Sequence, residues 1–246
     1  MGLIKTLKRK SSKISNIFLK KLDIQNKNII LTGSNTGIGL ELARKLIVNN
    51  NLLTLVNKNF ENLKVLNKKK IKIFQCDFEE NNLSNDLSNE IDMFKPNILI
   101  NCAGTFGFPD QDLSKIEIEN FKKVLNINVF SPLKLTQISL RSKNLEQIVN
   151  VTSEMGSISN NINGGYYYYR GSKTLLNSIS KNLSLDLKNK NINVFCIHPG
   201  NVKTKMNSSG IISPDISAQK IINIMSENNS NLSGLFIGIN KEIIKW

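Results

Sequence analysis

The chain has 246 residues, of which 40% are hydrophobic, and it carries a formal net charge of +14 at pH 7. A chain of this length can bury a large core in one compact domain. No apolar run approaches the roughly 18 to 20 residues that are needed to cross a bilayer, so the sequence excludes a transmembrane protein.

The positive charge is concentrated near the N-terminus. Residues 1–28 hold eight basic side chains and one acidic side chain, which accounts for half of the net charge. The whole chain has 29 lysines, 4 arginines and 37 asparagines, and it contains no recognisable nucleic-acid-binding motif. We interpret the charge as a bias in composition and expect no specific nucleic-acid partner.

Residues 1–26 are predicted to form a basic extension ahead of a single domain at 27–246. Within residues 1–22, apolar side chains recur at near-helical intervals among basic ones, which is the pattern of a basic amphipathic helix. Such a helix could contact an anionic membrane surface, act as a targeting peptide, or pack on the domain. The first six residues also match an N-myristoylation pattern, which applies only in a eukaryotic host.

A glycine-rich turn follows the first apolar strand, at residues 32–39, and precedes an amphipathic helix at 40–47. Glycines let the backbone turn tightly, and the free N–H groups at a helix N-terminus attract negative charge. The turn therefore predicts a pyrophosphate site, although it could also be a plain strand-to-helix connection. Its predicted binding residues are Gly33, Ser34, Thr36, Gly37, Ile38 and Gly39.

The end of the second strand bears on the choice between NAD and NADP. A carboxylate at this position would accept the ribose hydroxyls of NAD, whereas a basic residue would accommodate the additional phosphate of NADP. The strand at 52–56 is followed by Asn57, Lys58 and Asn59, with no acid. Lys58 therefore favours NADP (NADPH) as the cofactor over NAD.

Apolar strands alternate with helical segments along the rest of the chain. We expect strands near 28–32, 52–56, 71–76, 97–101, 147–152, 192–198 and 235–239, and helices near 38–49, 79–93, 115–142, 167–188 and 215–227. This alternation predicts an α/β fold, a doubly wound, Rossmann-type parallel sheet of about seven strands with helices on both faces. Gly33, Asn101, Ser153 and Pro199 each follow a strand, at the edge of the sheet where such folds bind ligands.

Tyr169 and Lys173 lie four residues apart at the start of a predicted helix, so both side chains project from one face. An ammonium group beside a phenol favours the phenolate and is expected to lower the tyrosine pKa toward working pH. The preceding residues 166–168 are also tyrosines. Only Tyr169 has a lysine four residues later, whereas Tyr166 is followed by Arg170, so the others are expected to line the substrate mouth or to pack the protein.

In these motifs the chain resembles the single-domain branch of the short-chain dehydrogenase/reductase family, over nearly all of residues 27–246. The family's glycine signature T-G-x-x-x-G-x-G corresponds to residues 32–39, and its tyrosine and lysine correspond to Tyr169 and Lys173. The remaining matches are Ser153 at a strand end, Asn128 ahead of the tyrosine and lysine, the N-A-G element at 101–104 with an inserted cysteine, and Pro199–Gly200 followed by Thr204. Residues 164–165, 198–204 and 234–246 look most like the carbonyl reductases related to the bacterial C-factor proteins.

The resemblance implies a hydride-transfer site. It gives Tyr169 the role of proton donor to a carbonyl oxygen, Ser153 the role of holding that oxygen, and Lys173 that of binding the nicotinamide ribose and lowering the tyrosine pKa. Asn128 would link the lysine to solvent through water, with Asn126 as a competing choice. Tyr169 is also an implied cofactor contact. The remaining implied contacts are Asp77, which meets the adenine unless it merely caps the next helix, and Asn101, Ala103, Gly104, Pro199, Gly200, Val202 and Thr204.

We therefore expect an NADP-dependent oxidoreductase that reduces a small aldehyde or ketone and can run in reverse as an alcohol oxidation. Only residues 207–213 form the loop where relatives cover the substrate, which favours a small carbonyl compound. The alternative is a cofactor-binding sensor or scaffold, attached to a membrane surface through residues 1–22.

Three cysteines lie near buried strands, Cys76, Cys102 and Cys196, and they indicate reduced thiols and a cytoplasmic setting. His198 is expected to be structural or to line the pocket. Homo-oligomers could pair through the helices near 115–142 and 167–188, with Leu175, Leu176, Ile179 and Leu183 as the apolar surface, although these side chains could instead face the sheet.

Overall fold

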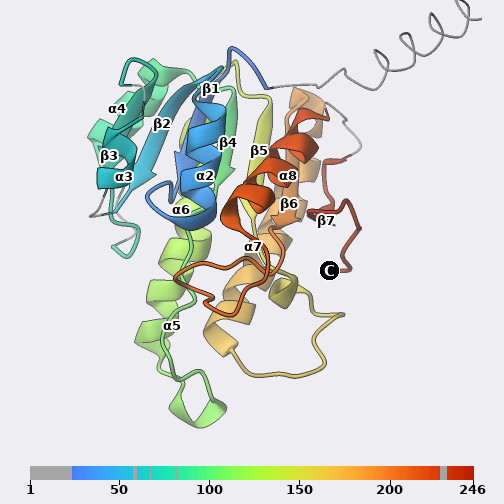
Figure 1. Ribbon diagram of the computed structural model, residues 1–246. Helices are drawn as coiled ribbons and strands as arrows, with labels where there is room; N and C mark the ends of the chain where they lie inside the picture. Colours follow the sequence, from blue (N-terminus) through green and yellow to red (C-terminus); the bar gives the residue numbers. More distant parts are fainter. Residues whose placement is uncertain (1–23, 58–59, 67, 81–82, 228–231) are drawn as a thin grey trace, which may run out of the picture.

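A seven-stranded, all-parallel sheet forms the centre of the computed structural model, which describes residues 24–57, 60–66, 68–80, 83–227 and 232–246 (Figure 1). The strand order is β3-β2-β1-β4-β5-β6-β7. The strands are β1 (Asn28–Thr32), β2 (Asn51–Val56), β3 (Ile71–Gln75), β4 (Ile98–Asn101), β5 (Gln147–Val151), β6 (Asn193–His198) and β7 (Phe236–Gly238). The predicted doubly wound fold is therefore confirmed.

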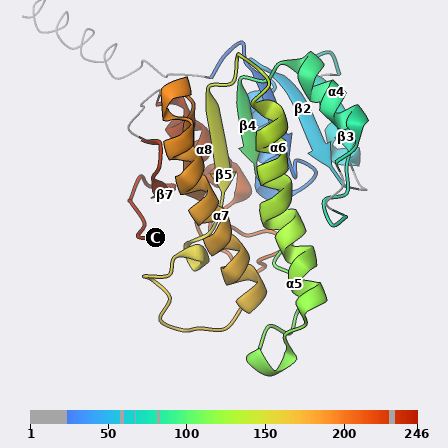
Figure 2. The same cartoon turned by 180° about the vertical axis from the view of Figure 1, so that it is seen from behind.

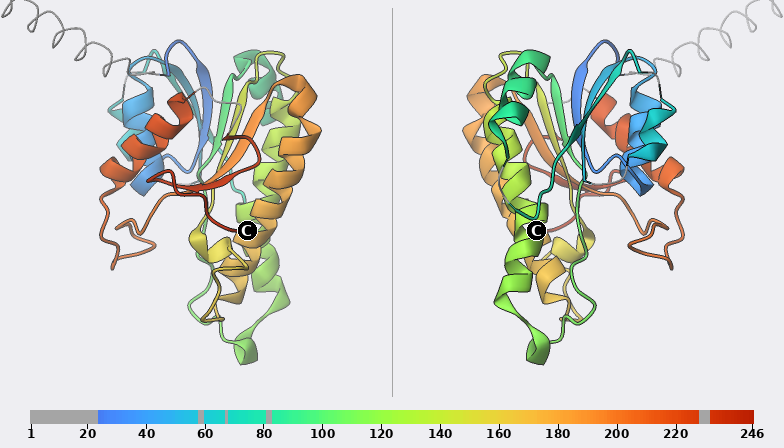
Figure 3. Two further views of the ribbon diagram at one scale, coloured as in Figure 1. Left: turned by 90° about the vertical axis from the view of Figure 1, so that its right-hand side faces the viewer. Right: turned by 90° about the vertical axis from the view of Figure 1, so that its left-hand side faces the viewer.

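Helices cover both faces of this sheet, so that the molecule has three layers (Figures 1, 2 and 3). The helices are α2 (Gly37–Leu46), α3 (Glu61–Lys64), α4 (Asn85–Phe94), α5 (Ile118–Leu125), α6 (Ser131–Ser139), α7 (Tyr167–Asp186) and α8 (Pro214–Ser226). Helices α2 and α8 pack on one face, and α4, α6 and α7 lie on the other. Ile29 and Leu31 of β1 enter the first core and Ile30 enters the second, which explains why buried parallel strands read as continuous apolar runs.

The continuous helix that we predicted at 115–142 is wrong. A short 3₁₀ turn (Leu113–Lys115) precedes α5, and a π-helical turn (Asn126–Phe130) separates α5 from α6. Pro132, in the first turn of α6, has no N–H to donate, and its ring would clash with the carbonyl of Asn128 in a regular α-helix. The wider turn accommodates this proline. It also places Asn128 on the inner side of the helix, where the side chain is fully buried.

The predicted helix at 79–93 begins later than expected. Ser84 forms its N-cap and accepts a hydrogen bond from the backbone N–H of Leu87 at 3.2 Å, so α4 starts at residue 85. A short helix that we did not predict, α3, follows β2.

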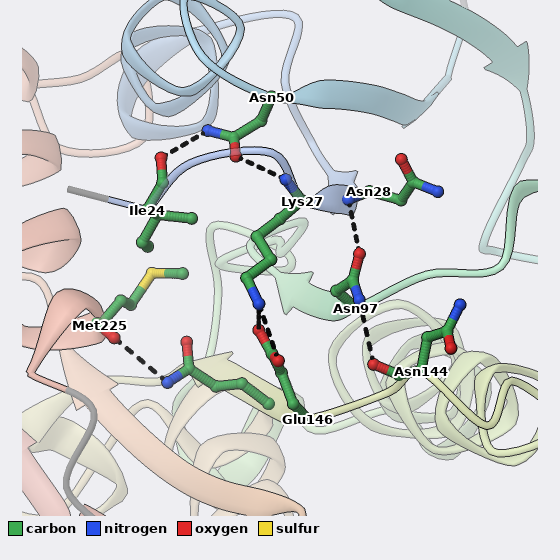
Figure 4. A network of polar contacts seen from close by, with 9 residues as sticks. Ile24, Lys27, Asn28, Asn50, Asn97, Asn144, Glu146 and Met225 are labelled. Atoms are coloured by element: carbon green, nitrogen blue, oxygen red, sulfur yellow. Dashed lines mark hydrogen bonds and ion pairs between the residues drawn. The ribbon is translucent and has the colours of Figure 1, made fainter.

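Polar side chains tie the strands together at their amino ends (Figure 4). The Nζ of Lys27 lies 2.7 Å from Oε1 of Glu146, and Oδ1 of Asn50 accepts a hydrogen bond from the N–H of Lys27 at 3.0 Å. Beside them, Oδ1 of Asn97 accepts from the N–H of Asn28 at 2.9 Å. We call these five residues the amino-end network. It lies at the end of the sheet opposite to the loops that follow the strands.

Candidate active site

A cavity of about 460 Å³ lies at the carboxyl ends of the strands. Residues of the β1–α2 turn form one side of it, and residues that follow β2, β3, β4, β5 and β6 form the rest. Of the predicted site residues, the cavity is lined by Gly33, Thr36, Gly37, Ile38, Gly39, Asp77, Ala103, Gly104, Tyr169, Lys173, Pro199 and Thr204. Motifs that are far apart in the sequence are thus brought to one place.

The glycine turn is packed too tightly for side chains. Gly33 has a φ of +71°, and a Cβ there would lie 2.7 Å from the Cα of Ala103. A Cβ at Gly39 would lie 2.2 Å from the carbonyl oxygen of Gly33. The hydroxyl of Thr32 accepts hydrogen bonds from the N–H groups of Cys102, at 3.0 Å, and Ala103, at 2.9 Å, and so fastens the turn to the end of β4.

These residues fit a dinucleotide. The N-cap of α2, Thr36, makes no side-chain bond to its helix, so the first N–H groups of α2 retain their capacity to bind an anion beside the cavity. The hydroxyl of Ser34 is buried in the turn without a hydrogen-bond partner among the described residues. Ser34 itself does not line the cavity, unlike the predicted contacts on either side of it, Gly33 and Thr36.

Gly39→Ala should lower the free energy of unfolding by about 1 to 3 kcal/mol, because its new methyl group overlaps backbone. It should also abolish dinucleotide binding, since the turn cannot keep its shape. Urea unfolding and titration with NADPH, followed by fluorescence, measure the two effects. Gly164→Ala is the control, because its Cβ would meet nothing within 4 Å. Its φ of +63° costs about 1 kcal/mol of strain, and binding should be unchanged. Normal binding by Gly39→Ala would show that the turn is not the pyrophosphate site.

Three polar side chains meet at the start of α7. Tyr169 lies in the first helical turn with Lys173 one turn later, and the Nζ of Lys173 is 5.8 Å from the centre of the Tyr169 ring. Lys173 is only 4% exposed, and its Nζ donates a hydrogen bond to the carbonyl of Val151 at 3.0 Å. Ser153, two residues beyond Val151, accepts a hydrogen bond from the N–H of Met155 at 3.2 Å through its Oγ, and it lies close enough to Tyr169 to lower the pKa of that phenol. The structure thus places all three predicted side chains in one cluster.

Burial controls the protonation of this cluster. It raises the pKa of Tyr169, and the neighbouring Ser153 hydroxyl opposes this rise only in part. Burial lowers the pKa of Lys173 from 10.5 to about 8, against smaller opposing effects of Cys102 and Cys196. The expected lowering of the tyrosine pKa by the lysine is therefore wrong, because the loss of water on burial is the largest effect on the phenol. Tyr169 consequently keeps its proton at neutral pH.

Asn128 joins this cluster from the π-helical turn. Its Nδ2 donates to the carbonyl of Thr105 and to Oγ of Ser172, both at 2.9 Å, while its Oδ1 accepts from the N–H of Thr105 at 2.8 Å. A Cβ at Gly104 would lie 3.4 Å from Oδ1 of Asn128 and 3.5 Å from Nζ of Lys173, so the two side chains flank the same glycine. The competing residue, Asn126, instead donates to the carbonyl of Glu79 at 2.6 Å.

The predicted adenine and phosphate contacts are only partly described. Asp77 lines the cavity, and its Oδ1 accepts a hydrogen bond from the N–H of Glu79 at 3.0 Å. The alternative role of capping the next helix is wrong, since Ser84 is the cap of α4. Asn57 also lines the cavity, and Lys58 lies outside the described residues, as does the predicted amphipathic segment 1–22.

Three other predicted cofactor contacts do not line the cavity, and neither do the predicted catalytic residues Asn128 and Ser153. Asn101 is buried, and its Nδ2 donates to Oδ1 of Asn150 at 2.7 Å, so it joins β4 to β5 inside the sheet. Gly200 has a φ of +83° and packs against Ile212 and Ile239. Val202 is buried and pairs with Ile212. Through these contacts, the three residues support the loops around the cavity.

The three neighbouring tyrosines, at the start of α7, differ in their burial and contacts. Tyr168 is fully buried, and its hydroxyl accepts a hydrogen bond from the N–H of Glu117 at 2.7 Å, so it packs the protein. Tyr166 and Tyr167 are partly exposed, and the ring of Tyr166 meets that of Phe106 edge-on at 5.4 Å.

Several cavity-lining residues were not predicted, among them Phe78, Thr105, Ile127, Lys205 and Met206. Phe78, Thr105, Lys205 and Met206 lie in loops that follow strands, within two residues of predicted contacts, so the rule that ligands bind beyond strand ends could have found them. Ile127 could not be found in this way, because the π-helical turn brings it to the cavity.

His198 has a structural contact, as expected: its Nδ1 accepts a hydrogen bond from the N–H of Glu154 at 3.2 Å, and burial lowers its pKa. The three cysteines are free thiols. Within the described ranges, no cluster of His, Cys, Asp and Glu could hold a metal ion. In the same part of the chain, no helix has the length and apolar character needed to cross a membrane.

Comparisons with known proteins agree with this fold. The family model described as short chain dehydrogenase matches residues 27–211. The chain is 31% identical over 154 residues to the C-signal protein of Myxococcus xanthus, in a match that covers 61% of this chain and 92% of that protein. Two further relatives are matched over only part of their own length. These are the 1-hydroxy-2-glutathionyl-2-methyl-3-butene dehydrogenase of Rhodococcus sp., at 62%, and the 3-dehydrosphinganine reductase of Danio rerio, at 59%.

Two solved structures are similar throughout. The carbonyl reductase Sniffer of D. melanogaster superposes with a TM-score of 0.82 and 26% sequence identity, covering 91% of this chain and 100% of that chain. An NADPH-bound carbonyl reductase from chicken fatty liver superposes with a TM-score of 0.78 and 21% identity, again covering 91% and 100%. The chain belongs to the short-chain dehydrogenase/reductase family, as an NAD(P)-dependent oxidoreductase with the fold of the carbonyl reductases.

Proposed function

We propose that this protein is an NADP-dependent reductase of a small aldehyde or ketone, with the reverse alcohol oxidation also open to it. The observation that carries the proposal is the buried cluster of Ser153, Tyr169 and Lys173 beside a cavity that fits a dinucleotide. A protein that only bound the cofactor, as in the alternative of a sensor or scaffold, would have no use for a buried proton donor. No contact of the described residues favours that alternative.

In this proposal each side chain of the cluster has a separate task. NADPH, when bound, supplies the hydride for the carbonyl carbon. The hydroxyl of Ser153 holds the carbonyl oxygen by a hydrogen bond, and Tyr169 donates its proton to that oxygen as the C–O single bond forms. Lys173 holds the ribose hydroxyls and stabilises the phenolate that remains. Asn128 fixes the loop around Thr105 next to Lys173, where water can return a proton.

The preference for NADP is supported by the residue directly after β2. Asn57 lines the cavity at the position where a carboxylate would accept ribose hydroxyls, and an amide does not repel a phosphate. The chicken carbonyl reductase structure contains NADPH, and a structure from Burkholderia multivorans with a TM-score of 0.79 and 20% identity contains NADP.

Thermal unfolding with NADPH, NADP, NADH or NAD tests the cofactor. A ligand at a hundredfold excess over its Kd adds about 2.7 kcal/mol to the free energy of unfolding, so the phosphorylated pair should raise the Tm most. Asn57→Asp should weaken NADPH binding roughly tenfold or more, because a carboxylate would then face the phosphate. Asn189→Asp changes the charge equally at an exposed site and should have no effect. Preferential stabilisation by NADH in the wild type would contradict the assignment, and failure to oxidise NADPH with any of a panel of small aldehydes and ketones would contradict the activity.

A further inference from the structure

Helix α7, which carries the proposed proton donor, begins without a cap of its own. Its N-cap residue, Tyr166, has a φ of 53° and makes no side-chain hydrogen bond to the first turn. The first N–H groups of any helix lack partners within the helix, and they are usually satisfied by the side chain of the N-cap. Tyr169, the third residue of α7, has one of these N–H groups. Something else must hold the first turn in place.

Gln111 supplies the missing contact from another part of the chain. Its side chain is only 4% exposed, although it comes from the loop between β4 and α5. Its Oε1 accepts a hydrogen bond from the N–H of Tyr169 at 3.2 Å, and its Nε2 donates to the carbonyl of Phe106 at 2.9 Å. Both ends of the amide are therefore used, which requires a side chain that can accept and donate at once.

The second partner of Gln111 is itself in contact with the tyrosine. The ring of Phe106 lies against the ring of Tyr169, with their centres 4.8 Å apart and their planes inclined by 37°. One residue earlier, Thr105 is held by both ends of the Asn128 amide. Gln111 thus closes a ring of contacts that runs from the peptide of Tyr169 through the loop and back to the phenol side chain.

We propose that Gln111 is a positioning residue, which caps α7 from a distance and fixes the Tyr169 phenol against Phe106. The inference rests on the proposed role of Tyr169 as proton donor. Without the bond from Gln111, the first turn of α7 and the loop at Phe106 lose their common support, and the phenol is free to shift. A displacement of about 1 Å can cost roughly a hundredfold in rate when reacting groups must be aligned. Cofactor binding through the glycine turn does not depend on this contact.

Gln111→Met tests the proposal, because methionine fills a similar volume but forms neither hydrogen bond. We expect kcat for NADPH-dependent carbonyl reduction to fall about 10- to 100-fold, while the Kd for NADPH stays within about twofold of the wild-type value. Hydrogen exchange at the Tyr169 amide, measured by NMR, should become faster than at the other protected amides of α7. Gln111→Asn retains an amide that is one methylene shorter and reaches one partner at most, so its kcat should be intermediate. It also provides a measurement if the methionine variant fails to fold.

Ser84→Ala is the matched control. It removes the cap of α4, a helix whose residues do not line the cavity, at a cost of about 1 kcal/mol. It should lower the Tm in the same way as the Gln111 variants and leave kcat unchanged. The proposal is overturned if the Gln111 variants lose stability but keep their kcat, or if exchange at the Tyr169 amide does not change. A failure of the proposed function would look different. Tyr169→Phe would then turn over carbonyl substrates as fast as the wild type, while hydrogen exchange at the Tyr169 amide would still be faster in Gln111→Met.

Discussion

Tyr169→Phe is expected to reduce kcat for carbonyl reduction by about 10²- to 10⁴-fold, the usual contribution of a positioned general acid. In the proposed mechanism the variant lacks the proton that is transferred to the carbonyl oxygen, since Ser153 only donates a hydrogen bond to that oxygen. Burial raises the pKa of Tyr169, so the wild-type phenol is protonated at neutral pH and ready to donate. Phenylalanine keeps the ring, and its packing on Phe106 should hold the helix in place.

Steady-state kinetics with NADPH and titration of NADPH without substrate separate catalysis from binding. The Kd for NADPH should stay within about twofold of the wild-type value, because the glycine turn is untouched. Tyr167→Phe removes the same hydroxyl from an exposed position two residues earlier on α7, and its kcat should equal that of the wild type. Equal loss of activity in both variants would mean that the effect comes from the helix and not from proton donation.

Lys173→Met is expected to remove activity and yet stabilise the protein. Burial of the ammonium destabilises the folded state, because it lowers the pKa of Lys173 from 10.5 to about 8. At neutral pH this shift corresponds to a loss of about 3 kcal/mol in the free energy of unfolding. Methionine avoids this cost, but the carbonyl of Val151 loses its donor, which costs about 1 kcal/mol. The free energy of unfolding at pH 7 should therefore rise by about 2 kcal/mol, while kcat falls because nothing stabilises the phenolate.

The pH dependence of stability gives a sharper test of the same variant. Between pH 8 and 10.5 the unfolded wild type binds the Lys173 proton and the folded state does not, so this residue makes stability increase with pH in that range. The difference in unfolding free energy between Lys173→Met and the wild type should therefore shrink from pH 8 to pH 10.5. Lys181→Met, which removes an exposed lysine from the same helix, is the control and should leave turnover unchanged. A difference that stayed constant across the range would contradict the depressed pKa.

Local sequence patterns predicted the sheet and much of the site, because parallel strands place their following loops at one edge. The turn around Gly33 and the pair Tyr169 and Lys173 depend on spacings of a few residues, and the structure brings both to the cavity. Their catalytic and binding roles remain predictions. The π-helical turn could not be read from periodicity, since a single widened turn barely alters the pattern of apolar residues.

Burial and long-range contacts account for the rest of the differences between prediction and structure. The pKa of Tyr169 was assigned the wrong direction because the sequence shows its neighbour Lys173 but not the loss of water around it. Gln111 looks like any loop glutamine, and its role appears only when the fold brings it to Tyr169, 58 residues later in the chain. Asn101 matches a binding motif, but its amide is committed to Asn150 within the sheet.

The amino-end network has a practical consequence for engineering. It joins β1, β4 and the start of β5 at the end of the molecule that lies away from the cavity (Figure 4). The hydrogen bonds and ion pair of this network involve neither residues 158–163 nor residues 205–209, which are mostly exposed and lie in the loops that follow β5 and β6. A directed-evolution library confined to these two loops would therefore leave the amino-end network intact. Most of its members should still express as folded protein, so that a screen for new carbonyl substrates would sample selectivity instead of misfolding.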